Sequence, residues 1–276
     1  MIDILTYFFL GLLQGVTEPI PVSSSGHILI LQTLLERFSQ GLNVDFEALA
    51  TITNFGSMIA IIIIFWKDIV TLVKSFFTYL FKSNERSKVK KDYSYCWKIV
   101  IASIPAGIFG LIATKLDLLE KLEENVKFIG LTLLITSLFL FLIRNFKGKK
   151  SRDEITFKDA IIIGLYQMVS VIPGISRSGA TIVGGMFQDL KREVAFNFSF
   201  ILYIPISIAT SLLGIKDLLE MSLSSSTWVL YIFSAIIAGI FTYIFTKWFK
   251  DIVKKGKLIY FSVYCLIVGL LVIIFL

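Results

Sequence analysis

Two short polar stretches in an otherwise apolar chain contain the residue types that phosphate chemistry needs. Residues 14–27 read QGVTEPIPVSSSGH and contain Glu18, a run of serines and His27, the single histidine of the chain. Residues 173–181 read PGISRSGAT and place Arg177 between two serines. Ionisable side chains inside apolar segments are energetically costly and mark functional sites. We therefore take these two stretches as the candidate site.

The serines and the arginine together predict an anion-binding site. In each stretch the serines follow a helix breaker, so Ser23 to Ser25 and Ser176 to Ser178 are expected to cap the starts of two helices. Helix N-termini offer free backbone N–H groups to anions, and the planar fork of Arg177 suits phosphate oxygens. The alternative is a purely structural ion pair between Arg177 and Glu18.

Glu18 and Gln14 are the candidate ligands for a metal ion. They are four residues apart, which places them on one face of a helix. Carboxylate and amide oxygens suit Ca²⁺ or Mg²⁺, particularly an ion that is shared with a phosphate group. The sequence therefore predicts a divalent-cation site next to the anion site.

His27 and the serines before it could carry out proton transfer and nucleophilic attack. His27 follows Ser24 by three residues and Ser23 by four, so all three can share one helical face. A histidine near a serine can act as a general base or proton donor. A packing or capping role for His27 is the alternative. Thr181, four residues after Arg177, could add a hydroxyl to the pocket.

Composition predicts that membrane helices position these residues. Of the 276 residues 56% are hydrophobic, and the mean hydropathy is +0.81. A membrane-spanning helix needs about 20 apolar residues. We predict an all-α polytopic membrane protein that forms one integral membrane domain over residues 1–276. The six predicted spans are 46–66, 94–115, 126–144, 193–214, 227–247 and 258–275.

The charges predict the orientation of the spans. The net charge is +7, but its placement argues against nucleic-acid binding, because the Lys and Arg residues gather in three loops, at about 82–98, 144–158 and 247–257. Basic loops normally stay cytoplasmic. The loops 36–45, 116–125 and 215–226 and the C-terminus are then outside. Residues 66–81 are apolar but contain three charges, and we expect a helix along the cytoplasmic interface.

The two polar stretches are copies of each other. GLLQGVTEPIPVSSSG, from Gly11, aligns without gaps with GLYQMVSVIPGISRSG, from Gly164, at an offset of 164 − 11 = 153. Three predicted spans separate the copies, so the second is inverted relative to the first. Inverted repeats with broken helices indicate a site near the bilayer midplane. We predict inverted repeats over about 1–115 and 150–276, each with one re-entrant helix hairpin, in the runs 4–35 and 156–187.

Both stretches resemble the signatures of a known family. QGVTEPIPVSSSGH and PGISRSGAT are similar to the two signatures of the bacterial undecaprenyl-diphosphate phosphatases of the bacitracin-resistance type. The resemblance implies hydrolysis of undecaprenyl diphosphate to the monophosphate, which recycles the lipid carrier of cell-wall synthesis, and dependence on Ca²⁺ or Mg²⁺. It implies roles for Gln14, Glu18, Ser23, Ser24, His27, Ser176, Arg177, Ser178 and Thr181. Many members have glutamate where this chain has Gln14, which puts more weight on Glu18 as the metal ligand.

The resemblance and the residues together give a specific expectation. The catalytic residues would be Glu18, Ser24, His27 and Arg177, in a bacterial plasma-membrane enzyme whose site opens to the outside. The prenyl tail would stay among membrane lipids, and a homodimer is left open. The rival interpretation is a lipid flippase without hydrolysis, because broken inverted repeats are typical of transporters. An anion channel fits poorly, since these groups would hold phosphate too tightly for conduction.

Overall fold

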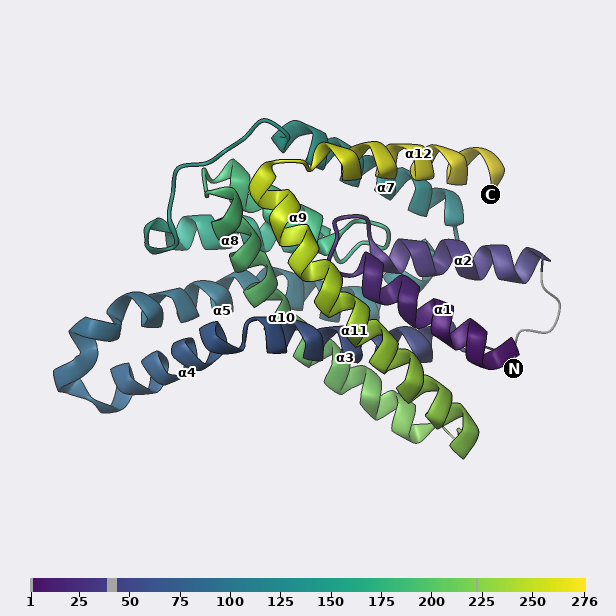
Figure 1. Ribbon diagram of the computed structural model, residues 1–276, viewed down its shortest axis with the longest axis horizontal. Coiled ribbons are helices and arrows are strands. Elements are labelled where there is room, and N and C mark those ends of the chain that lie inside the picture. Colours follow the sequence, from purple (N-terminus) through teal and green to yellow (C-terminus); the bar gives the residue numbers. More distant parts are fainter. Residues whose placement is uncertain (1, 39–43, 222) are drawn as a thin grey trace.

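The chain forms an all-helical assembly in the computed structural model, which describes residues 2–38, 44–221 and 223–276 (Figure 1). Residues 39–43 and 222, parts of the predicted outer loops, lie outside the described residues. The α-helices are α1 (Ile2–Thr17), α2 (Ser24–Phe38), α3 (Phe46–Ile64), α4 (Trp66–Phe81), α5 (Arg86–Lys115), α6 (Leu118–Glu123), α7 (Val126–Ile143), α8 (Phe157–Val169), α9 (Arg177–Phe187), α10 (Arg192–Glu220), α11 (Ser225–Lys255) and α12 (Ile259–Phe275).

Five helices are long and apolar enough to cross a membrane: α3, α5, α7, α10 and α11. They correspond to five of the six predicted spans, although α5, α10 and α11 extend well beyond the apolar runs that predicted them. The sixth predicted span corresponds to α12, which has 17 residues and a length of about 26 Å at 1.5 Å per residue. The described helices thus fit a polytopic membrane protein.

The broken helices are present in both copies of the repeat. In the first, α1 ends at Thr17 and α2 begins at Ser24; in the second, α8 ends at Val169 and α9 begins at Arg177. Prolines lie in both interruptions, where they cannot continue a helical hydrogen-bond ladder. Both pairs of short helices are therefore hairpin-like elements whose breaks expose helix ends.

Equivalent glycines attach the two hairpins to long helices. Gly11 on α1 lies against the backbone of Ser234 on α11, so closely that a Cβ would overlap the carbonyl oxygen. Gly164 on α8 lies equally close to Ala102 on α5. The two glycines are 153 residues apart, the offset of the sequence repeat. The repeat is therefore present in helix packing as well as in sequence.

The two ends of the molecule carry different loops. Figure 1 shows both termini and the α10–α11 connection at one end, with the α4–α5 turn at the other. The basic loops contact one another through the ion pairs Lys91–Asp153 at 2.6 Å and Arg152–Asp92 at 2.8 Å. The hydrogen bond from Lys91 holds the pKa of Asp153 below its usual value.

Helix α4 has the bounds predicted for the interfacial helix. It packs back along α5, where the ring of Tyr93 stacks on Tyr79 at a centroid distance of 3.9 Å. Its opposite side exposes Val73, Phe77 and Phe81. The position of α4 along a membrane interface stays a prediction.

Candidate functional site

The tips of the two hairpins meet inside the helix assembly. The Cβ that Gly26 lacks would lie 3.2 Å from the Cα atom of Gly174, and the Ser178 hydroxyl donates to the Ile20 carbonyl at 3.3 Å. Irregular backbone at this depth is tolerated where protein or a wet cavity surrounds it. Arg177 and Glu18, which are 159 positions apart in the sequence, can therefore belong to a single site.

Glu18 lies at the centre of that site. The Nη2 atom of Arg177 donates to Glu18 Oε1 at 2.5 Å, and the Ser24 hydroxyl donates to Glu18 Oε2, also at 2.5 Å. The Glu18 side chain is only 8% exposed, so its charge depends on these partners. The Arg177–Glu18 ion pair, given above as the structural alternative, is present. The Ser24 hydroxyl points its proton at the same carboxylate.

The ring of Tyr203 on α10 packs against the guanidinium of Arg177. The guanidinium carbon of Arg177 lies 3.6 Å from the centroid of the Tyr203 ring, a cation–π contact. The fork is thereby fixed between a ring and a carboxylate. Sequence reasoning missed Tyr203, because nothing in its local sequence distinguishes it from other aromatic residues of α10.

Gln14 links the centre to α3. Its Nε2 atom donates to Glu18 Oε2 at 3.0 Å and also to the Asn54 side-chain oxygen. Its Oε1 atom is buried and has no hydrogen-bond partner in the described protein. Asn54 lines the same cavity as Gln14 and Ser24.

The predicted N-caps are confirmed at Ser23 and Ser176. The Ser23 hydroxyl accepts the Gly26 N–H at 3.2 Å, and the Ser176 hydroxyl accepts the Gly179 N–H at 3.1 Å. Each capping serine also contacts the second serine after it, Ser25 at 3.4 Å and Ser178 at 3.3 Å. The hydroxyls of these four serines are thus engaged at the helix starts. The Ser24 hydroxyl instead donates to Glu18.

His27 points away from Glu18. Its Nδ1 atom lies 2.8 Å from the Ser23 carbonyl oxygen, which can only accept, so Nδ1 carries the proton. Its Nε2 atom then accepts from the Tyr264 hydroxyl on α12, at 2.7 Å, and the two rings are stacked. Ser23 has a left-handed backbone (φ 69°), which is uncommon for serine, and the His27 bond supports it. Both ring nitrogens of His27 are thus engaged, Nδ1 by the Ser23 carbonyl and Nε2 by the Tyr264 hydroxyl.

Thr181 also faces away from the centre. Its hydroxyl lies 2.5 Å from that of Ser199 on α10 and donates to the Arg177 carbonyl at 2.9 Å. The structure therefore brings Gln14, Glu18, Ser24 and Arg177 together. It places His27 and Thr181 behind the helix starts, where they contact α12 and α10.

A cavity of about 810 Å³ reaches Gln14 and Ser24 of this centre, whereas Glu18 and Arg177 are not among its lining residues. Gln14, Ser24, Ser25 and Asn54 line its inner part, and residues of α2, α3, α5 and α6 line its mouth. Its described lining includes Glu36, Asp45, Asp117 and Glu124, from the two loops that the charge pattern predicts to be outside.

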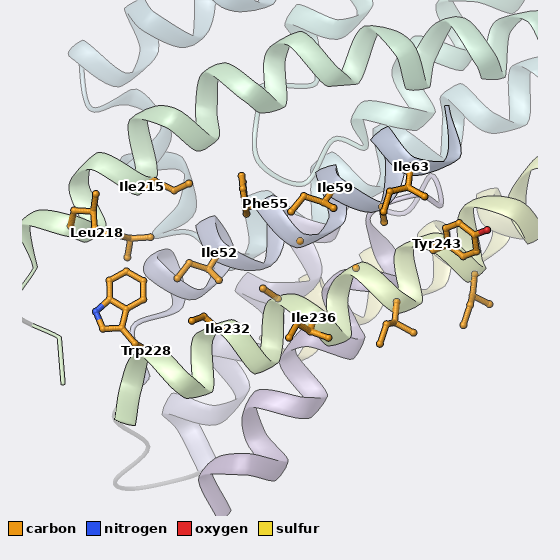
Figure 2. Close-up of a pocket in the computed structure, with 17 residues that line it drawn as sticks. Ile52, Phe55, Ile59, Ile63, Ile215, Leu218, Trp228, Ile232, Ile236 and Tyr243 are labelled. Carbon is orange, nitrogen blue, oxygen red and sulfur yellow. The ribbon is translucent and has the colours of Figure 1, made fainter. Parts of the chain in front are cut away.

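A second cavity, of about 920 Å³, lies on another face of α3 (Figure 2). Branched aliphatic side chains of α3, α10 and α11 line it, such as Ile52, Ile59 and Ile236, and its polar atoms come from Trp228 and Tyr243. None of the site residues described above belongs to its lining. It offers apolar surface but no group that could react with a phosphate.

The oxygen atoms of the centre fit a divalent cation that is shared with a substrate. Gln14 Oε1 is a buried oxygen without a partner, and Glu18 is the adjacent carboxylate. Among the described residues no three Asp, Glu, His or Cys side chains are grouped as a metal site. The protein alone thus offers too few ligands for a closed site, whereas phosphate oxygens would complete the shell, as is usual for Mg²⁺.

The two copies of the repeat differ in their chemistry. At the offset of 153, Glu18 corresponds to Val171, Ser24 to Arg177, and His27 to Ala180. The acid and the serine come from the first copy and the arginine from the second. The centre therefore exists once, where the copies meet, and not twice.

Comparison with known proteins identifies the family of the chain. The family model of bacitracin resistance protein BacA matches residues 7–271. The chain is 44% identical over 273 residues to undecaprenyl-diphosphatase 2 of Bacillus thuringiensis (strain Al Hakam), covering 99% of this chain and 98% of that protein. It is 42% identical to undecaprenyl-diphosphatase of Oceanobacillus iheyensis, with coverage of 99% and 97%. The chain thus belongs to the bacitracin resistance protein BacA family.

Proposed function

We propose that this protein is a membrane phosphatase that hydrolyses undecaprenyl diphosphate to undecaprenyl phosphate and inorganic phosphate. The observation that carries the proposal is the arrangement in which Ser24 and Arg177 both contact Glu18. A candidate nucleophile and a candidate phosphate clamp are thereby each within hydrogen-bond reach of the base. Relatives that match nearly the whole chain are named for this activity.

The geometry supports Ser24 as the nucleophile and Glu18 as its base. As the Ser24 oxygen attacks the terminal phosphorus, its proton moves to Glu18 Oε2, 2.5 Å away. The bond from that phosphorus to the bridging oxygen breaks, and the lipid monophosphate leaves. Glu18 passes its proton to the departing monophosphate and then deprotonates a water molecule, which attacks the phosphoserine; the proton returns to the Ser24 oxygen as phosphate leaves. In the alternative route, Glu18 activates a water that attacks directly, and Ser24 only positions it.

Arg177 and the helix starts stabilise the charge of the transferred group. One Arg177 nitrogen holds Glu18, which leaves other N–H groups of the fork for phosphate oxygens. Free N–H groups at the starts of α2 and α9 add partial positive charge. Such preorganised electrostatic contacts provide most of the catalysis in phosphoryl transfer. A bound divalent cation, held by Gln14 Oε1 and Glu18, would neutralise further phosphate charge.

His27 acts in this proposal as a support and not as the base. Its two ring nitrogens are used by Ser23 and Tyr264, so it fixes the turn that precedes Ser24. The hydroxyl of Thr181 similarly fixes the start of α9 against α10. Substrate contacts come from Gln14, Ser25 and the helix starts.

We place the enzyme in the bacterial plasma membrane with six spans, two re-entrant hairpins and the cavity open to the outside. The basic loops at the opposite end of the molecule support this orientation. The prenyl tail stays among membrane lipids while the diphosphate enters the site. Recycling of this lipid would support cell-wall synthesis and bacitracin resistance.

The test is release of phosphate from a polyprenyl diphosphate by the purified protein in detergent, with Ca²⁺ or with a chelator. We expect metal-dependent release that the Arg177→Ala variant loses. Folded protein that binds the lipid diphosphate but releases no phosphate would contradict the proposal. That result would favour lipid transport, to which the inverted repeat is also suited.

A further inference from the structure

The mouth of the 810 Å³ cavity is strongly acidic. Asp117, Glu120, Glu123 and Glu124, at and around α6, line it. From the facing side, α2 contributes Glu36 and the start of α3 contributes Asp45 and Glu47. No lysine or arginine is among the residues that line this cavity.

Lys115, Lys121 and Lys127 are close to these carboxylates in sequence but form no ion pair with them in the described residues. None of the ion pairs found in the described part of the chain involves one of these carboxylates. Burial, and then the charges of Glu47 and Glu120, raise the pKa of Glu123 above its usual value. Asp45 is engaged as the N-cap of α3, and Glu36 accepts a hydrogen bond from Gln32. The mouth therefore holds a concentrated negative field.

The acidic mouth is unexpected above a centre that binds phosphate. A negative field repels free phosphate and diphosphate ions, and it raises the local concentration of cations. The end of the cavity supplies an independent sign of a cation: the Oε1 atom of Gln14, in a residue only 1% exposed, lacks a partner and can only accept or coordinate. A cation that passes the mouth would meet this oxygen.

We propose that the acidic mouth is an electrostatic filter that admits divalent cations to Gln14 and excludes phosphate anions that are not attached to a lipid. The inference builds on the proposed phosphatase function. A lipid-linked diphosphate overcomes the repulsion because its tail partitions into the membrane, whereas a soluble phosphate gains nothing comparable. The same field speeds the departure of the phosphate product. The filter is thus a determinant of specificity for lipid-linked substrates.

The test compares two full-length variants with equal change in charge. The mouth variant carries Glu120→Gln, Glu123→Gln and Glu124→Gln, at three residues that line the cavity. The control carries three equivalent changes away from the cavity, Glu85→Gln, Glu220→Gln and Asp251→Asn. Binding of Mn²⁺ is measured by electron paramagnetic resonance without substrate. Inhibition of lipid-diphosphate turnover by inorganic phosphate is measured in parallel.

At about 10 mM ionic strength, where charges act over about 30 Å, we expect the mouth variant to bind Mn²⁺ about tenfold more weakly than the control. Inhibition by inorganic phosphate should become stronger by about the same factor. At about 1 M salt, where the screening length is about 3 Å, both differences should disappear.

The proposal requires both changes. It is overturned if Mn²⁺ binding or phosphate inhibition is the same in the mouth variant as in the control, or if the differences persist at high salt. The Mn²⁺ measurement does not depend on turnover, so it tests the filter even if the native protein releases no phosphate. In that case the proposed function fails separately from the filter.

Discussion

The ion pair between Arg177 and Glu18 allows a test that separates folding from catalysis. Arg177→Ala removes the partner of a carboxylate that is 8% exposed, and the loss of one member of a buried pair typically costs about 3–5 kcal/mol. The contact with Tyr203 adds about 1 kcal/mol. Since small domains are stable by about 5–15 kcal/mol, we expect a destabilised but folded variant.

Arg177→Ala should also slow turnover. The lost transition-state stabilisation should be similar in size to the lost folding stability, but it has an independent origin. Loss of a preorganised charge contact reduces turnover by about 10²–10³, or about 2.7–4 kcal/mol of transition-state stabilisation. In the double variant Arg177→Ala/Glu18→Gln the unpaired charge is gone, so most of the stability should return. Turnover should stay at the level of the single variant or below it, because neither the clamp nor the base is present.

The assays are thermal unfolding in detergent and phosphate release from a polyprenyl diphosphate. Arg177→Lys is the matched control: it keeps a charge facing Glu18 but loses the fork, so stability should be nearly retained while the rate falls at least about tenfold. Near-native turnover in the double variant would refute the reasoning, since the pair would then be only structural. A double variant that is no more stable than Arg177→Ala would refute the account of the buried charge.

Further predictions concern the nucleophile, the cap, helix packing and the metal. Ser24→Ala should reduce turnover about 10²-fold or more without a change in stability, whereas substantial activity would favour direct attack by water. Tyr264→Phe leaves His27 Nε2 without its donor and should lower unfolding stability by about 1–3 kcal/mol, measured by thermal unfolding. Gly56→Ala should cost about 1–3 kcal/mol in the same assay, because the new methyl overlaps a carbonyl of α11, while Gly107→Ala, with open space around it, should not destabilise. A chelator should abolish turnover, and added Ca²⁺ or Mg²⁺ should restore it; turnover that is unaffected by the chelator would contradict a shared cation.

Much of the fold could be predicted from sequence because its signals are local. Apolar runs predict the long helices, and serines after breakers predict the caps at Ser23 and Ser176. The gap-free repeat predicts that two broken helices occupy equivalent places. The ends of the helices were less predictable: α5 begins at Arg86, well before the predicted start at 94, because a charged first half continues the helix outside the apolar run.

The centre of the site was predicted from residue types, but its outer contacts were not. Glu18 and Arg177 are the ionisable residues of the two tips, so their meeting follows once the tips are brought together. The partner of His27 is 237 residues away on α12, and spacing along one helix cannot reveal it. Spacing alone therefore placed His27 on the Ser24 face, whereas tertiary contacts turn it towards α12.

The difference between the two copies of the repeat affects the lipid itself. Because Glu18 corresponds to Val171, the proposed centre forms only once among the described residues, although the sequence repeat is present twice. In the proposed reaction a lipid would lose one phosphate without changing leaflet. Each turnover would then lower the headgroup charge on one side of the bilayer only, and return of the monophosphate to the other side would be a separate step.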